Sequence, residues 1–187
     1  MFNKKIILGS ASPRRADILK MAGVDFEVHA ADVEEIVKPA LSPEEVTIDI
    51  AQQKLQAIQE HHRNEIILTS DTVVVIENDI LGKPKNAEDA KKMLQRLSGK
   101  QHSVITGVVL SQADNVKAFS VMTKVFFKEL SEQDIDYYIK NYKPFDKAGS
   151  YAIQEFIGAI GIEKIEGDYY NVVGLPVSRV VEELSWF

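Results

Sequence analysis

A group of residues suited to binding anions follows the first apolar run of the chain. In the stretch IILGSASPRRADIL, Ser10 and Ser12 precede Pro13 and the adjacent Arg14 and Arg15. Backbone N–H groups at a helix start, serine hydroxyls and guanidinium groups all donate to phosphate oxygens. Two cations at the partly positive end of a helix are unfavourable unless an anion is present. The stretch therefore indicates phosphate binding; the alternative is a helix capped by Ser12 with both arginines in solvent.

Two lysines are further candidates for this chemistry. Lys54 is expected on the apolar face of a helix, at four-residue spacing from Ile50 and Ile58. A lysine there either extends along the apolar surface to water or pairs with a buried anion. Lys83, in the stretch LGKP, is either another phosphate contact or a turn residue before a proline. The spacing leaves both alternatives open for each lysine.

Three carboxylates lie in places that suit a metal or a proton acceptor. Asp71 follows the apolar run EIILTS, and carboxylates at strand ends of an open α/β sheet commonly face its ligand. Such aspartates also cap turns. Glu34 and Glu35 lie in the acidic stretch ADVEEIV, which is typical of a solvated loop. Beside phosphate-binding cations, however, these carboxylates indicate a divalent metal, Mg²⁺ or Mn²⁺, that bridges to phosphate oxygens.

The order of the expected elements favours an α/β fold. Helix starts are marked by Ser42 with Glu45, which form a capping box, and by Asn86 and Ser131. Helices alternate with strands early in the chain, and hairpins follow in the middle. We expect an elongated mixed β-sheet flanked by helices, with two lobes around a deep cleft. The strands are expected at residues 4–9 and 26–30, on both sides of 70–72, and at 103–111, 117–128, 151–154 and 159–165.

The composition is that of a globular chain. Its 187 residues are 45% hydrophobic, and 22 Lys and Arg stand against 28 Asp and Glu, which gives a formal net charge of −6. An acidic balance without a long basic run argues against nucleic acid as a partner. The absence of cysteine excludes disulfides and cysteine-ligated metals. No apolar run suits a signal peptide or a membrane span, so we expect a cytoplasmic protein without a membrane partner.

Six short motifs resemble, in this order, the signatures of the Maf family of nucleoside triphosphate pyrophosphatases. They are LGSASPRRADIL, TSDTVVV, LGKP, LSGKQHSVITGV, DKAGSYAIQ and EGDYYNVVGLP, and the match runs from about Ile6 to Pro176. The resemblance implies one Maf-like domain over residues 1–187, a fold like that of inosine triphosphate pyrophosphatases, and a homodimer. It also implies a metal-dependent hydrolase that cuts a nucleoside triphosphate between its α- and β-phosphates. Members of the family are associated with removal of abnormal nucleotides and with arrest of septum formation.

The resemblance also implies roles for individual residues of this chain. Asp71 matches the proton acceptor that activates the attacking water, and Glu35 matches a second acidic position that would hold the metal together with Asp71. The family's phosphate-binding positions correspond to Ser10, Arg14, Arg15, Lys54 and Lys83.

Base selectivity, by the same resemblance, involves Arg14, Thr72 and Gln154. This combination resembles the branch of the family that acts on dTTP and UTP, with modified pyrimidine nucleotides as further candidates. That branch has glycine on both sides of its Ile-Gln pair, whereas this chain has Ala152 and Glu155. The difference leaves the expected reaction intact and bears on the preferred base.

Two other functions would use the same phosphate-binding residues. A non-catalytic nucleotide sensor that regulates septum formation through a protein partner needs neither Asp71 nor a metal. A phosphomonoesterase or phosphotransferase is expected to release orthophosphate instead of pyrophosphate. Analysis of the products separates these functions from a pyrophosphatase.

Overall fold

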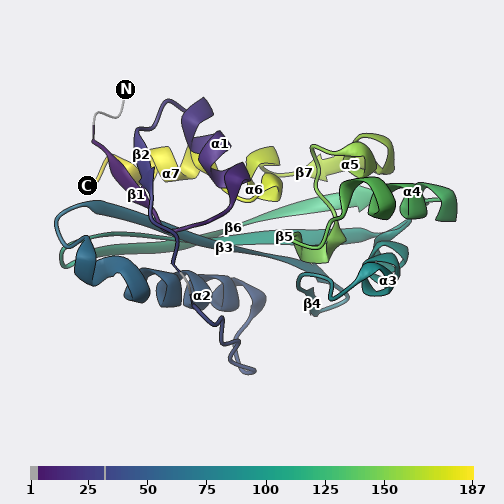
Figure 1. Ribbon diagram of the computed structural model, residues 1–187, viewed down its shortest axis with the longest axis horizontal. Helices are drawn as coiled ribbons and strands as arrows, with labels where there is room; N and C mark the ends of the chain where they lie inside the picture. Colours follow the sequence, from purple (N-terminus) through teal and green to yellow (C-terminus); the bar gives the residue numbers. More distant parts are fainter. Residues whose placement is uncertain (1–3, 32) are drawn as a thin grey trace. The chain divides into compact units, whose positions relative to one another are not determined.

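The computed structural model describes residues 4–31 and 33–187, which are drawn in colour in Figure 1. The chain divides into two compact units. The first unit comprises Met1–Thr72, Thr106–Val121 and Gly174–Phe187, and the second comprises Val73–Ile105 and Met122–Val173. In the described ranges, every helix falls short of the length and apolar character needed to cross a membrane.

Seven strands form one mixed sheet (Figure 1): β1 (Ile6–Leu8), β2 (Phe26–Val28), β3 (Ile66–Ile76), β4 (Asp79–Leu81), β5 (Gln101–Gln112), β6 (Asn115–Phe127) and β7 (Ile162–Glu166). The strand order is β2-β1-β3-β5-β6-β7, and β4 pairs with β3. Strand β1 is parallel to β2 and β3, whereas β4 is antiparallel to β3 and β7 is antiparallel to β6. The expected α/β fold with a mixed sheet flanked by helices is confirmed; the elongated outline, the cleft and the single domain stay predictions.

The first unit has helices on both faces of its strands. They are α1 (Pro13–Met21), α2 (Pro43–Ile58), the short 3₁₀ helix η1 (Gln59–His61) and α7 (Val177–Leu184). Figure 1 shows α2 on one face of the strands and α1 on the other. Successive side chains of a strand point to opposite faces. Ile7, Ile67 and Val109 thus share the face on which they pack against Ala51 and Leu55 of α2.

The second unit has its own apolar core. Its helices are α3 (Ala87–Leu97), α4 (Glu132–Tyr142), the 3₁₀ helix η2 (Ala148–Ser150), α5 (Phe156–Gly161) and α6 (Tyr169–Val173). Leu94 and Leu97 of α3 and Tyr138 of α4 are fully buried with Val125 of β6. This core supports the turns that carry the candidate residues of the second unit.

Three of the expected helix starts are confirmed by their capping bonds. Ser42 and Glu45 form the capping box of α2, in which each side chain accepts from the other residue's backbone N–H. Asn86 caps α3, and Ser131 caps α4. Ser12 has the backbone conformation of an N-cap, but its side chain makes no capping hydrogen bond.

One expected strand in the second unit was wrong, and another was right only in its second half. Residues 151–154 form coil and a turn, and residues 159–161 of the expected strand 159–165 belong to helix α5 (Phe156–Gly161), whereas its residues 162–165 are extended in β7 as expected. A Cβ atom on Gly158 would lie 2.0 Å from the backbone oxygen of Ile153, so only glycine permits this close packing of α5 on the turn. Short apolar runs do not distinguish a helix from a strand, which is why the pattern misled.

Candidate active site

Strand β3 carries two neighbouring candidate residues, Asp71 and Thr72, whose side chains point to opposite faces of the sheet. We expected Asp71 after the end of a strand, but β3 runs without a break from Ile66 to Ile76, so this expectation was wrong. Because side chains alternate along the strand, Asp71 faces α2 and Thr72 faces α1. A long strand thus presents two adjacent side chains to two separate groups of partners.

On the α2 face, Lys54 joins the two expected acidic residues. Its Nζ atom lies 2.7 Å from Oδ1 of Asp71 and 2.9 Å from Oε1 of Glu35. Lys54 and Asp71 are each 9% exposed, whereas the side chain of Glu35 is 38% exposed. The alternative in which Lys54 extends to water is therefore wrong, because its ammonium pairs with a buried carboxylate.

Helix α2 fixes the position of Lys54. The capping box holds its first turn, and Pro43 occupies a first-turn position where its missing N–H costs nothing. The side chains of Ile50 and Ile58 lie four residues on either side of Lys54 and are buried. Their packing orients the lysine stem toward the strands, which leaves the ammonium in reach of Asp71.

The two carboxylates fit a divalent metal that also binds the substrate. Asp71 and Glu35 each direct one oxygen at the same cationic nitrogen. Among the described residues, no group of three or more His, Cys, Asp and Glu side chains is arranged to hold a metal. Mg²⁺ is commonly bound through one or two carboxylates plus phosphate oxygens and water. The donor set is therefore suited to Mg²⁺ or Mn²⁺ in the presence of a triphosphate.

On the α1 face, Arg15 acts as a clamp. Its Nε donates to the carbonyl of Gly174 at 2.9 Å, Nη1 donates to Oγ of Ser10 at 2.9 Å, and Nη2 donates to Oγ1 of Thr72 at 3.2 Å. Burial lowers the pKa of the guanidinium, and the charge of Asp71 acts in the opposite direction. Arg15 thus joins the helix start, β3 and the segment before α7 within the first unit.

The neighbours of this clamp extend it. Thr72 Oγ1 lies 2.9 Å from Oγ1 of Thr106, which is fully buried on β5. Arg14, which precedes the clamp on α1, is half-buried. The adjacent arginines therefore differ in exposure: Arg15 is buried and donates three hydrogen bonds within the protein, and Arg14 is the more accessible of the two.

The second unit carries the two remaining candidates on irregular segments. Lys83 is exposed in the coil that follows β4. Gln154 is exposed in the turn before α5, between buried Ile153 and half-buried Glu155. Both residues belong to the second unit.

Seven of the candidates lie in the first unit: Ser10, Arg14, Arg15, Glu35, Lys54, Asp71 and Thr72. Lys54 bonds to Asp71 and Glu35 on one face, and Arg15 bonds to Ser10 and Thr72 on the other. Sequence reasoning missed Thr106 and the carbonyl of Gly174 as members of the Arg15 clamp. Both lie in motifs that the resemblance had marked, VITGV and VVGLP, and this was the available signal.

The fold and these motifs define a class of protein. Residues 5–187 match the Maf family, described as Maf-like protein, and the chain belongs to that family. A relative from Cytophaga hutchinsonii named dTTP/UTP pyrophosphatase is 46% identical over 185 residues, which cover 99% of this chain and 85% of that protein. A relative of the same name from Bacillus cereus (strain ATCC 10987) is 50% identical over 184 residues, covering 98% and 90%. Among solved structures, the Staphylococcus aureus Ham1 protein aligns with a TM-score of 0.47 at 17% identity, over 66% of this chain and 72% of that one.

Proposed function

We propose that this protein hydrolyses dTTP and UTP to the nucleoside monophosphate and pyrophosphate. The observation that carries the proposal is the buried pairing of Asp71 with Lys54 beside Glu35. Relatives named dTTP/UTP pyrophosphatase, which match 98–99% of the chain, support the choice of substrates. Modified pyrimidine nucleotides belong to the same proposal, because they present the same triphosphate.

Asp71 is the proposed proton acceptor. Its Oδ1 accepts a hydrogen bond from Lys54, and this bond fixes the orientation of the carboxylate. Within the described residues, Oδ2 takes part in no hydrogen bond, so it is the oxygen that would accept a proton from the attacking water. A carboxylate held in one orientation avoids reorganisation when the proton moves.

The basic residues would stabilise the charge of the triphosphate. Pyrophosphate leaves with a high negative charge, which positioned cations stabilise as it develops. We assign this role to Arg14, Lys54 and Lys83. Ser10 and Arg15 support it by shaping the start of α1, since two of the three Arg15 bonds hold Ser10 and Thr72.

A divalent metal is part of the proposal. Asp71 and Glu35 would hold Mg²⁺ or Mn²⁺ together with phosphate oxygens. When bound, the metal would act as a Lewis acid that stabilises charge on those oxygens. Metal dependence is tested by titrating the cation into metal-free protein with each nucleotide, and turnover undiminished in a chelator would contradict it.

The resemblance adds a homodimer, a cytoplasmic location and a link to arrest of septum formation. These stay proposals. The mass of the protein in solution, measured by light scattering during gel filtration, tests the dimer, because a monomer of 21.0 kDa is well separated from twice that mass.

The test of the function is product analysis. The protein is incubated with UTP, dTTP, CTP, GTP, ATP and 7-methyl-GTP, in Mg²⁺ or Mn²⁺. We expect monophosphate and pyrophosphate, formed fastest from UTP and dTTP. Release of orthophosphate would favour a phosphomonoesterase or phosphotransferase, and binding of nucleotide without turnover would favour a non-catalytic sensor.

A further inference from the structure

The turn that carries Gln154 is held on both sides while Gln154 itself is exposed. Tyr151, Ala152 and Ile153 are each less than one-tenth exposed, at 6%, 6% and 9%. The hydroxyl of Tyr151 lies 2.7 Å from Nε2 of His102, which is also buried. A single exposed polar side chain on a turn with buried neighbours is suited to meeting a ligand at a fixed place.

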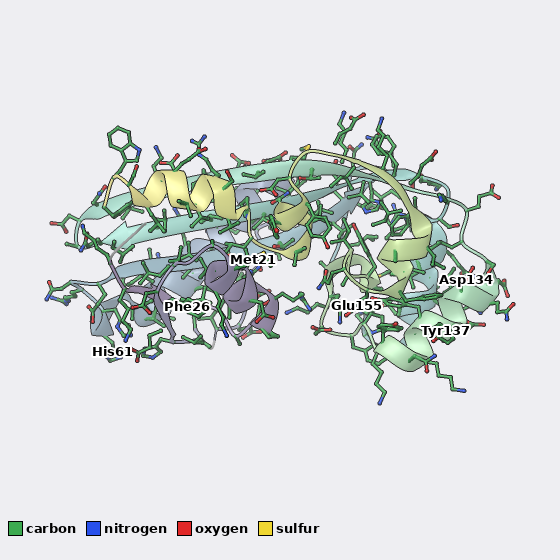
Figure 2. The ribbon with its side chains drawn as sticks, turned by 90° about the horizontal axis from the view of Figure 1, so that it is seen from above. Met21, Phe26, His61, Asp134, Tyr137 and Glu155 are labelled. Atoms are coloured by element: carbon green, nitrogen blue, oxygen red, sulfur yellow. The ribbon has the colours of Figure 1, made fainter. Side chains whose placement is uncertain are left out.

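Glu155, which replaces the glycine typical of the dTTP/UTP branch, is tied into the second unit. Its Oε2 accepts a hydrogen bond of 2.5 Å from the hydroxyl of Tyr138, and its Oε1 lies 3.4 Å from Nζ of Lys147. Lys147 is only 7% exposed. Figure 2 shows Glu155 close to α4, the helix that carries Asp134 and Tyr137. The added carboxylate is thus paired within the unit and does not contribute an isolated negative charge beside Gln154.

The Tyr138 hydroxyl bonds to both ends of the turn. It accepts from the backbone N–H of Ala152 at 3.2 Å and donates to Glu155, so one oxygen atom brackets Ile153 and Gln154. Burial, followed by the hydrogen bond to Glu155, raises the pKa of Tyr138, so the hydroxyl stays protonated as a donor at neutral pH. The ring is fully buried in the core of the second unit, which gives this oxygen a fixed position.

Lys147 links this turn to the segment of Lys83. The Lys147 carbonyl accepts from the backbone N–H of Ser150, and the N–H of the intervening Gly149 donates to the carbonyl of Gly82 at 3.0 Å. Gly149 has a φ of +64° and packs against Val74, so a side chain there would be strained and crowded. Lys83 follows Gly82, which bonds to Gly149, and Gln154 precedes Glu155, which pairs with Lys147. Both exposed candidates of the second unit are therefore next in sequence to a residue that contacts the 147–150 segment.

We propose that Tyr138, Glu155 and Lys147 are positioning residues that hold the Ile153–Gln154 turn and thereby set the base preference of the enzyme. The inference rests on the proposed function and deepens it, because it names what fixes the residue that would meet the base. Glu155 acts through the turn; it does not contact the substrate in this assignment. A glycine at position 155 could form neither the hydrogen bond to Tyr138 nor the ion pair with Lys147. The turn of this chain is therefore held by contacts that a glycine could not supply.

Two variants remove the bonds one at a time. Tyr138→Phe keeps the buried ring and deletes the oxygen that brackets the turn. Glu155→Gln keeps an acceptor for Tyr138 and deletes the charge that faces Lys147. Tyr137→Phe, on the same helix at a half-exposed position, and Glu163→Gln, at an exposed position on β7, are matched controls for the same chemical changes.

The measurement is selectivity, expressed as the ratio of kcat/KM for dTTP to kcat/KM for GTP, with hydrogen exchange at the Ala152 amide as a readout independent of activity. We expect Tyr138→Phe to lower the ratio roughly tenfold, less than the about 10²-fold cost of a full misplacement, and Glu155→Gln to lower it less. The Ala152 amide should exchange faster in Tyr138→Phe, and both controls should behave as the wild type.

The outcomes distinguish the positioning role from the proposed function. Wild-type selectivity in both test variants, with normal turnover, would overturn the positioning role and leave the proposed function intact. An equal loss on all nucleotides together with a lower Tm would also overturn it, because that result describes general destabilisation. A wild-type protein that turns over no nucleotide would overturn the proposed function and this inference with it.

Discussion

Four candidate residues of the first unit, Ser10, Arg15, Lys54 and Asp71, are buried and each bonds to another candidate, whereas those of the second unit are exposed on irregular segments. Asp71 and Lys54 are each 9% exposed and share a hydrogen bond. Lys83 and Gln154 are exposed and lie outside regular structure. Groups that move protons or stabilise charge benefit from a fixed, water-poor setting, whereas a residue that reads a ligand needs access to it. The first group should therefore respond to mutation in stability as well as activity, and the second in activity alone.

The largest effect is expected at Asp71. Asp71→Asn removes the proton acceptor while it keeps the shape of the side chain, and a general base contributes about 10²–10⁴-fold in rate. Because Glu35 still pairs with Lys54, the ammonium keeps a charged partner and the fold should survive. The measurement is kcat for dTTP together with Tm.

The matched control for this variant is Asp25→Asn, which makes the same change at an exposed position of the first unit. It should leave both quantities unchanged. A rate within a few-fold of wild type for Asp71→Asn would remove Asp71 from the mechanism.

The next largest effect tests the clamp and separates the two arginines. Arg15→Lys replaces a planar fork with a single ammonium, which cannot reach Gly174, Ser10 and Thr72 together. Loss of buried, charge-assisted hydrogen bonds should lower the free energy of unfolding by roughly 2–4 kcal/mol. Urea unfolding measures this change.

Arg14→Lys is the comparison, because Arg14 is half-buried on the same helix. We expect it to cost less than about 1 kcal/mol in stability and to raise KM for the triphosphate. Equal stability losses for the two variants would show that Arg15 is no more structural than its neighbour.

A third effect depends on pH and involves His102, a buried residue that bonds to Tyr151 next to the Gln154 turn. Burial lowers the pKa of His102 from 6.5 to about 4, and its Nε2 bonds to the hydroxyl of Tyr151. Between these values the unfolded chain binds a proton that the folded protein excludes, so stability is retained above pH 6.5 and is lost as the pH falls through about 4. The loss should reach about 2 kcal/mol by a pH of about 5.

Unfolding in urea across this pH range checks the sign and the size of the effect. His102→Gln should flatten the dependence, because the titrating group is gone, whereas the exposed His61→Gln should keep it. The same slope in wild type and His102→Gln would assign the acid sensitivity to other groups.

Local sequence patterns were sufficient to predict much of the candidate site in the first unit. The capping box and the apolar spacing predicted α2, and they placed Lys54 on a buried face. The spacing could not choose between a solvated and a paired lysine, because the partner, Asp71, lies on a separate strand. Pairing across the fold is a tertiary property, so it became visible only when α2 was packed on β3.

The rest depends on contacts that are distant in sequence or on backbone packing. The clamp joins Arg15 to Gly174, which lies 159 residues further along the chain. Helix α5 is six residues long and apolar, and its packing on Ile153 requires the glycine at 158, which a hydrophobic pattern does not reveal. Glu155 stood out as a departure from the family pattern, but its partners Tyr138 and Lys147 did not.

The smallest effects on stability are expected at the exposed residues of the second unit. Lys83→Ala and Gln154→Ala remove side chains that are exposed outside regular structure, so each should change the free energy of unfolding by less than about 0.5 kcal/mol. Their activities should still differ from wild type, and from each other.

Lys83→Ala should raise KM for every triphosphate alike, because it removes a positive charge that would contact the phosphates, and all of these substrates carry the same phosphates. Gln154→Ala should lower the preference for dTTP over GTP, because an amide reads a base edge and not a phosphate. Steady-state kinetics with dTTP, UTP and GTP, alongside urea unfolding, measure both quantities. If Gln154→Ala destabilised the protein as much as Arg15→Lys, the exposed turn would be part of the core structure, and the contrast between the two units would fail.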